Sequence, residues 1–166
     1  MILPPFDSLR VQHDAVLRLM RFQWVDPVKH YLRSALVHGR NLRPALIYGR
    51  DLVITHQPTR VLIDFEGLPP LSLQDELWMS TNWLPQVAGQ SLEQVALVLR
   101  REHIHNQMMV ESLLWTGRHL LRFQLQVFGD VPAALDWLTQ GDAAAIRRLL
   151  DEWNALPPLP GATLPT

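Results

Sequence analysis

One stretch of the chain, residues 60–83, constrains the fold more than any other. It opens with a short continuous apolar run, Val61-Leu62-Ile63, that is rich in β-branched residues. Such a run is typical of a strand covered on both faces, because neither face can then carry polar side chains. Gly67 and two prolines end the run, and Ser72 followed by Asp75 predicts a capping box at the start of a helix. The stretch therefore predicts a buried central strand that leads into a helix.

Strand-like and helix-like segments alternate along the rest of the chain. Large β-favouring side chains at 16–25 and 31–37, separated by Asp26-Pro27, predict an antiparallel hairpin, and a helix over 28–38 is the alternative. Periodicity and capping residues predict the remaining elements, which are helices at 41–57, 72–88, 105–117 and 142–154, a helix capped by Asp130, and strands at 60–66, 94–99 and 121–128. A hairpin followed by strand–helix alternation predicts an α/β domain with a mixed β-sheet.

Local features refine three of these elements. Asn41 is a suitable N-cap for the helix at 41–57, with Pro44 in its first turn, where the missing N–H is tolerated. Pro85 is expected to kink the helix at 72–88 or to end its first part. The clean alternation of apolar and polar residues at 121–128 predicts a half-exposed strand near an edge of the sheet.

The two ends of the chain are assigned as follows. Residues 1–9 contain two prolines and are expected to be irregular, and residues 8–14 are compatible with either a short edge strand or a helical turn. We therefore divide the chain into an N-terminal arm at 1–15, a domain at 16–140, an amphipathic helix at 141–156 that packs on the domain, and a disordered Pro/Gly-rich tail at 157–166.

Composition excludes several classes of function. The chain has 166 residues, of which 48% are hydrophobic and 19% charged, with a net charge of −1 and no cysteine. It is therefore expected to form one domain with a real core, without disulfides or thiolate chemistry and without a global attraction to nucleic acid. It has no secretory pattern and no apolar run of the ~20 residues that cross a bilayer, so we expect a cytoplasmic protein without membrane insertion.

Four motifs, taken in order, resemble a known family. They are VLIDFEGL at 61–68, ELWMSTNWLP at 76–85, QVALVL at 94–99 and VFGDVPAALDWL at 127–138. Their order and spacing resemble the SpoIIAA-like branch of the STAS/SEC14 superfamily, in its uncharacterised bacterial members. The resemblance extends over roughly residues 16–140 and implies a STAS-like mixed sheet with a C-terminal helical extension.

The resemblance implies a protein that is not an enzyme and has no cofactor. STAS-like anti-sigma-factor antagonists carry a phosphorylatable serine in an Asp-Ser-Ser-Gly loop after the central strand. The corresponding loop at 65–72 lacks this pattern, and Ser72 is its only hydroxyl. We therefore expect a protein-interaction or regulatory domain without this switch. We also expect a homodimer that uses a sheet edge or the helix at 142–154, and an unidentified protein partner is possible. The alternative, from the SEC14 side of the superfamily, is a binder of a small apolar, lipid-like ligand.

The candidate binding residues form three groups. Asp64 and Glu66 follow the central strand, where open α/β sheets bind ligands, although loop ordering alone explains two carboxylates at this place. Ser72 has a plain role as a helix cap. Trp78 and Trp83 lie five residues apart on one predicted helix, so one is expected in the core and the other at a pocket or interface.

A histidine pair is the most chemical-looking feature. His103 and His105 follow Glu102, and together with Asp64 they would be the residues of a metal-dependent hydrolase, which is a distant alternative. A zinc site needs three or four converging ligands, and the spacing supplies two. The favoured interpretation is a polar loop after a strand, and we expect no metal.

Overall fold

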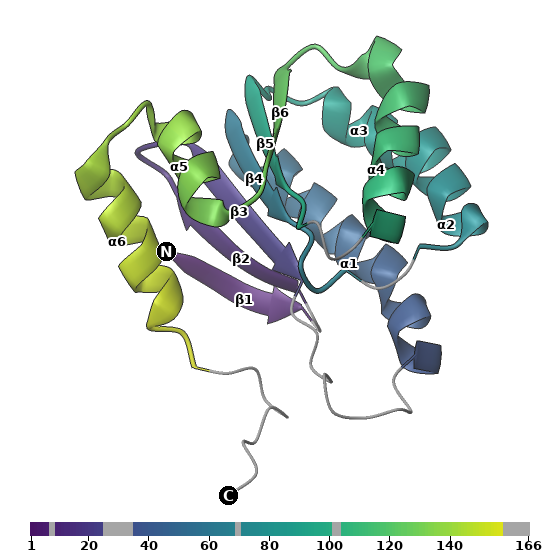
Figure 1. Cartoon of the computed structure of the whole chain (residues 1–166), viewed down its shortest axis with the longest axis horizontal. Helices are drawn as coiled ribbons and strands as arrows, with labels where there is room; N and C mark the ends of the chain where they lie inside the picture. The colour runs from purple at the N-terminus through teal and green to yellow at the C-terminus, as the bar shows by residue number, and fades with distance from the viewer. Residues whose placement is uncertain (7–8, 25–34, 69–70, 101–103, 158–166) are drawn as a thin grey trace, which may run out of the picture.

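The computed structural model describes residues 1–6, 9–24, 35–68, 71–100 and 104–157, with the backbone alone for 35–41 and 104–106. Within these residues the chain forms one mixed β-sheet whose six strands follow one another in the order of the sequence. The strands are β1 (Ile2–Phe6), β2 (Leu9–Asp14), β3 (Leu19–Trp24), β4 (Arg60–Asp64), β5 (Gln94–Val98) and β6 (Gln124–Phe128). β1, β2 and β3 are antiparallel, and β3 to β6 are parallel (Figure 1). The predicted mixed α/β fold is confirmed.

Helices cover both faces of this sheet (Figure 1). Right-handed crossovers between parallel strands that advance in one direction place their helices on one face. These helices are α1 (Ala35–His56), α2 (Leu73–Trp78), the π-turn η1 (Met79–Trp83), α3 (Leu84–Ala88), α4 (Ile104–Gly117) and the 3-10 turn η2 (Arg118–Leu120). After β6 the chain crosses to the other face, where α5 (Val131–Thr139) and α6 (Ala143–Asn154) lie.

The central strand is covered on both faces, as predicted. Val61 and the partly buried Ile63 of β4 pack with the core under α1, α3 and α4, whereas Leu62 is fully buried in the second core under α5 and α6. Successive side chains of a strand point to opposite faces, so a continuous apolar run fits only such a position.

The helix after the central strand also follows its prediction. Ser72 caps α2 through a capping box with Asp75, whose backbone N–H donates to the Ser72 hydroxyl over 3.1 Å. The π-turn η1 ends at Trp83, and Pro85 lies in the first turn of α3, which begins at Leu84. Because Pro85 has no N–H and its ring crowds the carbonyl of Thr81, a regular α-helix cannot pass this point.

The prediction for the N-terminal end is wrong. Residues 1–9 were expected to be irregular, but β1 spans Ile2–Phe6 and β2 begins at Leu9, so both belong to the sheet. Pro4 and Pro5 lie in β1, which is the edge strand of the sheet, and an edge tolerates residues without an N–H. Of the segment 8–14, for which strand or helical turn was left open, the described residues 9–14 form the strand β2, which lies inside the sheet between β1 and β3.

The strand predicted at 16–25 does form an antiparallel hairpin, but the other strand of that hairpin was wrongly assigned. β3 pairs antiparallel with β2 through a turn at residues 15–18, in which Arg18 has a φ of 49°. Of the expected partner 31–37, residues 35–37 are helical in α1, and 31–34 lie outside the described residues. Asn41 is therefore inside α1 and is not its N-cap, since the helix already begins at Ala35. Ala35 and Leu36 are good helix formers, which explains the earlier start.

The C-terminal elements match their predictions in kind and place. β6 is the other edge strand, and Asp130 caps α5 by accepting from the backbone N–H of Ala133 over 2.8 Å. Leu149 and Trp153 of α6 are buried. Most of the predicted tail lies outside the described residues. No helix in the described part of the chain combines the length and apolarity needed to cross a bilayer.

A substitution in α6 tests whether this helix belongs to the same cooperative unit as the sheet. Leu149 is fully buried, so Leu149→Ala should lower the free energy of unfolding by about 2–5 kcal/mol while unfolding stays a single transition. Chemical denaturation followed by circular dichroism measures both. The neighbouring exposed change Arg147→Ala should stay within about 0.5 kcal/mol of the parent. A separate early transition in the parent protein would contradict the assignment.

Candidate functional site: an apolar cavity and a separate buried charge cluster

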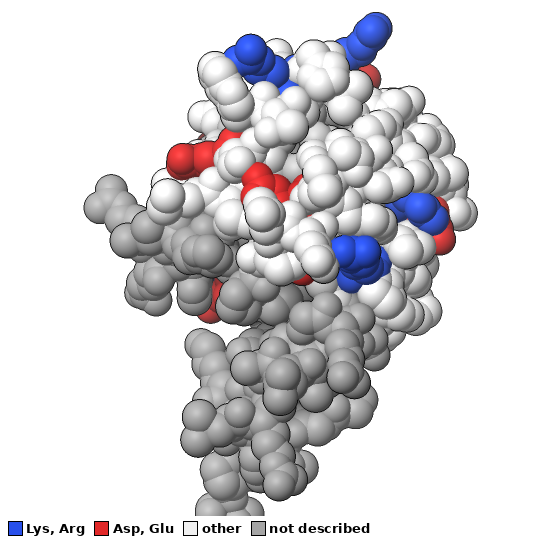
Figure 2. Space-filling model, turned by 90° about the vertical axis from the view of Figure 1, so that its right-hand side faces the viewer, with Lys and Arg blue, Asp and Glu red and all other residues white. Residues whose placement is uncertain are grey.

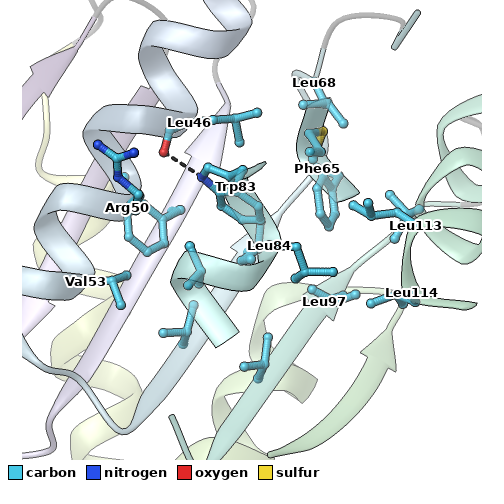
Figure 3. Close-up of a pocket in the computed structure, with 18 of the residues that line it drawn as sticks. Leu46, Arg50, Val53, Phe65, Leu68, Trp83, Leu84, Leu97, Leu113 and Leu114 are labelled. Atoms are coloured by element: carbon cyan, nitrogen blue, oxygen red, sulfur yellow. Dashed lines mark hydrogen bonds between the residues drawn. The ribbon is translucent and has the colours of Figure 1, made fainter. Parts of the chain in front are cut away.

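An apolar cavity lies between the sheet and the helices of its first face (Figure 3). Its volume is about 90 Å³. Five neighbouring strands, β2 to β6, contribute to its floor, and α1, η1, α3 and α4 contribute to its walls. The lining side chains labelled in Figure 3 are Leu46, Arg50, Val53, Phe65, Leu68, Trp83, Leu84, Leu97, Leu113 and Leu114.

The lining turns no polar atom toward the cavity, although one lining residue, Trp24, has a buried indole N–H without a hydrogen-bond partner among the described residues. The indole N–H of Trp83 donates to the carbonyl of Leu46 over 2.8 Å and is thereby satisfied (Figure 3). Arg50 is the one charged side chain among the lining residues, and its guanidinium is bound by Asp51 and Gln86. A molecule in this cavity is therefore held by dispersion and by burial of its apolar surface.

Local sequence explains why space remains here. Gly49 lies in the interior of α1, and a Cβ built on it would lie 3.5 Å from Cε1 of Phe22, which is an ordinary contact distance. A methyl group would thus fit, and glycine leaves its volume empty. The π-turn η1 contributes Met79 and Trp83 to the opposite wall, and π-turns recur at functional sites.

The cavity lowers the stability of the domain. At about 24 cal/mol per Å³, a void of this volume costs about 2 kcal/mol. Empty apolar cavities in proteins stay dry and accept apolar guests, as an engineered cavity of about 150 Å³ that binds benzene illustrates. The geometry therefore suits a small guest without polar groups.

A second feature is a cluster of charges at the carboxyl ends of β3, β4 and β5. Asp64 is fully buried, and its Oδ1 accepts from the backbone N–H of Glu66 over 3.0 Å. Arg100 forms two contacts of 3.1 Å with the carboxylate of Glu66, and one of its nitrogens lies 3.9 Å from Oδ2 of Asp64. The structure thus brings the two predicted carboxylates together and links them through Arg100.

Arg21 completes this cluster from β3. It is 4% exposed, and its guanidinium carbon lies 3.8 Å from the centre of the Trp153 ring on α6. Burial lowers the pKa of Arg21 to about 10, and the nearby charge of Asp64 opposes this shift. Burial also raises the pKa of Asp64. Among the described residues, Arg21 Nε and Nη1 and Asp64 Oδ2 have no hydrogen-bond partner.

The other candidate site residues predicted from the sequence lie in different parts of the fold. Ser72 serves as the cap of α2, and the half-buried Trp78 lies under the guanidinium of Arg43 at 5.4 Å, while Trp83 lines the cavity. His103 lies outside the described residues, and so does the side chain of His105. Asp64 shares its cluster with Arg21 under α6, on the other face of the sheet from Trp83. The described members of the predicted set therefore do not form one site.

Sequence reasoning missed two residues that matter here. Arg21 stands within the apolar run 19–24, where a lone charge is a visible signal of a buried ion cluster. Gly49 interrupts a helical pattern, and a glycine inside a helix often has a packing reason. In the described part of the chain, no group of three His, Asp or Glu residues is arranged to hold a metal ion.

Comparison with known proteins adds no relative: no family model, no curated protein and no solved structure matches this chain.

Filling the cavity tests its energetic effect. Gly49→Ala should raise the free energy of unfolding by about 1–2 kcal/mol, because alanine favours the helix and its methyl group becomes buried. Thr55→Ala, at an exposed position of the same helix, is the control for helix propensity alone and should gain less. Denaturation of the parent and both variants measures the difference. A lower free energy of unfolding for Gly49→Ala than for the parent would contradict the presence of room for a methyl group beside Gly49.

The burial of Asp64 predicts a pH dependence. Since its pKa is raised in the folded state, the folded protein holds this proton more tightly than the unfolded chain, whose pKa is about 3.9. The contribution of Asp64 to stability therefore falls as the pH rises above that value and through the folded pKa. Asp64→Asn lacks this proton, so its stability relative to the parent should increase over the same range.

Denaturation at a series of pH values measures this relative stability. The exposed change Asp136→Asn is the control for removing one carboxylate. A relative stability of Asp64→Asn that falls with rising pH would contradict the burial of an ionisable group at this position.

Proposed function

We propose that this protein binds a small apolar ligand in the cavity between its sheet and the α1, η1, α3 and α4 layer. The observation that carries the proposal is the cavity itself, with a volume of about 90 Å³ and a lining of apolar side chains from both layers. The stability lost to this void, about 2 kcal/mol, is a large fraction of the free energy of unfolding of a typical domain. A ligand that fills it offsets this loss.

The lining chemistry defines the ligand. Trp83 is already hydrogen-bonded to Leu46, and the guanidinium of Arg50 is bound at the rim by Asp51 and Gln86. A polar group placed deep in the cavity would lose its water without gaining a partner, which costs several kcal/mol. The ligand is therefore a hydrocarbon or a molecule whose buried part is hydrocarbon.

A non-catalytic role accompanies this proposal. Arg100 pairs with Glu66 and lies near the fully buried Asp64, and none of these three side chains lines the cavity. Ser72 is engaged by Asp75 on two sides, as hydroxyl donor and as acceptor. These contacts support structural roles for Asp64 and Ser72.

A regulatory interaction domain of the STAS-like type is the second candidate. Its support is the mixed sheet, with a hairpin followed by strand–helix alternation, and an exposed apolar face on α2 and α4. Family membership remains a prediction from the four sequence motifs. The two candidates are compatible, since the cavity is internal and the face is external.

Thermal denaturation with small probes tests ligand binding. Propane and n-butane, which are small enough for this volume, should raise the unfolding free energy by RT ln(1 + [L]/Kd), which is about 2.7 kcal/mol at a hundredfold excess over Kd. Ethylene glycol, which is polar at both ends, should not. Native mass spectrometry of freshly purified protein then searches for a co-purifying apolar molecule.

A filled-cavity variant provides the matched control. Ala45 lines the cavity and is fully buried, so Ala45→Leu should remove the stabilisation by propane and n-butane. Gly49→Ala is the gentler alternative if Ala45→Leu lowers stability by overpacking. Equal stabilisation of the parent and the filled variants, or none in the parent, would refute binding in this cavity.

A further inference from the structure

The most exposed apolar side chains of the described residues include a group on two neighbouring helices. Leu73 and Leu77 of α2 are 79% and 63% exposed, and Met108 and Trp115 of α4 are 64% and 70% exposed. The hydroxyl of Ser112 donates to the carboxylate of Glu76, which joins the two helices between these side chains. The four residues therefore form one surface, here called the α2–α4 face.

Most of this face is uncharged, and the charged residues on it include Glu76, Glu111 and Arg118. Figure 2 looks at the side of the molecule on which α2 and α4 lie, and most of the described surface there belongs to uncharged residues. Contiguous apolar surface of this kind is unusual on a protein without a partner for it.

Charged and apolar residues alternate along one side of α4 and of η2 behind it. Met108, Glu111, Trp115 and Arg118 follow one another at spacings of three and four residues, so they share one exposed stripe of the helix and of η2 behind it. Glu111 and Arg118 lie on opposite sides of Trp115 and are about 10 Å apart along the axis. The stripe thus has an acidic end, an aromatic centre and a basic end.

Such a stripe is complementary to itself. Two copies of α4 that cross antiparallel about a twofold axis near Trp115 place each Glu111 opposite the other copy's Arg118. A twofold interface needs this reciprocity, because residue i contacts residue j and j contacts i. The guanidinium of Arg118 already lies 3.9 Å from the centre of the Trp115 ring, which orients both side chains on the surface.

We propose that the protein forms an isologous homodimer through the α2–α4 face, with Trp115 at its centre and reciprocal Glu111–Arg118 pairs at its ends. Large aromatic side chains at the centre of an interface contribute most of its binding free energy. A bilayer surface is a poorer occupant, because Glu111 would face anionic head groups. The amphipathic helix α6 is not the interface, since its apolar stripe is buried against the sheet.

Sedimentation equilibrium across the micromolar range tests the proposal with the full chain. The parent protein should convert from monomer to dimer, and Trp115→Ala should weaken the dimer on the order of 30-fold or more. Arg147→Glu, an exposed charge reversal on α6, is the control and should leave the dissociation constant unchanged. Circular dichroism checks that each variant is folded.

A charge exchange tests the antiparallel pairing itself. Glu111→Arg and Arg118→Glu alone should each weaken the dimer by about tenfold or more, because each opposes like charges across the axis. The double variant restores opposite charges and should recover at least about tenfold over the weaker single variant. A strict monomer, a dimer that is insensitive to Trp115→Ala, or no recovery in the double variant would overturn the proposal.

Discussion

The structure depends on burying the β4 strand on both faces. Leu62 is fully buried under α5 and α6, while Val61 and Ile63 face the opposite helical layer. A strand with apolar side chains on both faces requires two covering layers, and the parallel run from β3 to β6 supplies the first through its crossover helices. The second layer comes from α5 and α6, which follow the last strand. Arg21 stacks on Trp153 and Asp14 pairs with Arg148, so both contacts fix α6 over β2 and β3.

The two faces of the sheet are packed differently, and the cavity lies on the first of them. Under α5 and α6, small and branched side chains such as Ala134, Leu135 and Leu138 are fully buried. Under α1, α3 and α4, larger side chains surround the cavity, and neither Gly49 nor the π-turn η1 closes it. Natural interiors have few voids larger than a water molecule, so an apolar void of this volume is a specific feature of the first face.

Much of the fold was accessible from the sequence because its signals are local. The apolar run of β4, the capping box of α2 and the break at Pro85 each act within a few residues, and each lies where predicted. The errors came from choices that only tertiary contacts decide. Residues 9–14 could pair as a strand or turn as a helix, and their pairing with β3 decided it; the start of α1 was misplaced because Asn41 and Pro44 imitate a helix start.

The candidate sites were less predictable than the fold. Asp64 and Glu66 were placed correctly at a strand end, but their link through Arg100 and the burial of Arg21 depend on side chains from three strands. The cavity has no sequence signature, because its lining residues are ordinary core residues. Gly49 was its one local sign, and a glycine in a helix indicates a space without giving its size.

Crystallography under xenon pressure would test the central claim, that an apolar cavity lies between the sheet and the layer of α1, η1, α3 and α4. Xenon binds dry apolar cavities through dispersion, so its electron density reports the space directly. We expect one or more xenon atoms among Gly49, Phe22, Met79 and Trp83, with loss of occupancy in Gly49→Ala. Density without xenon in the parent protein, with these side chains in mutual contact, would contradict the account.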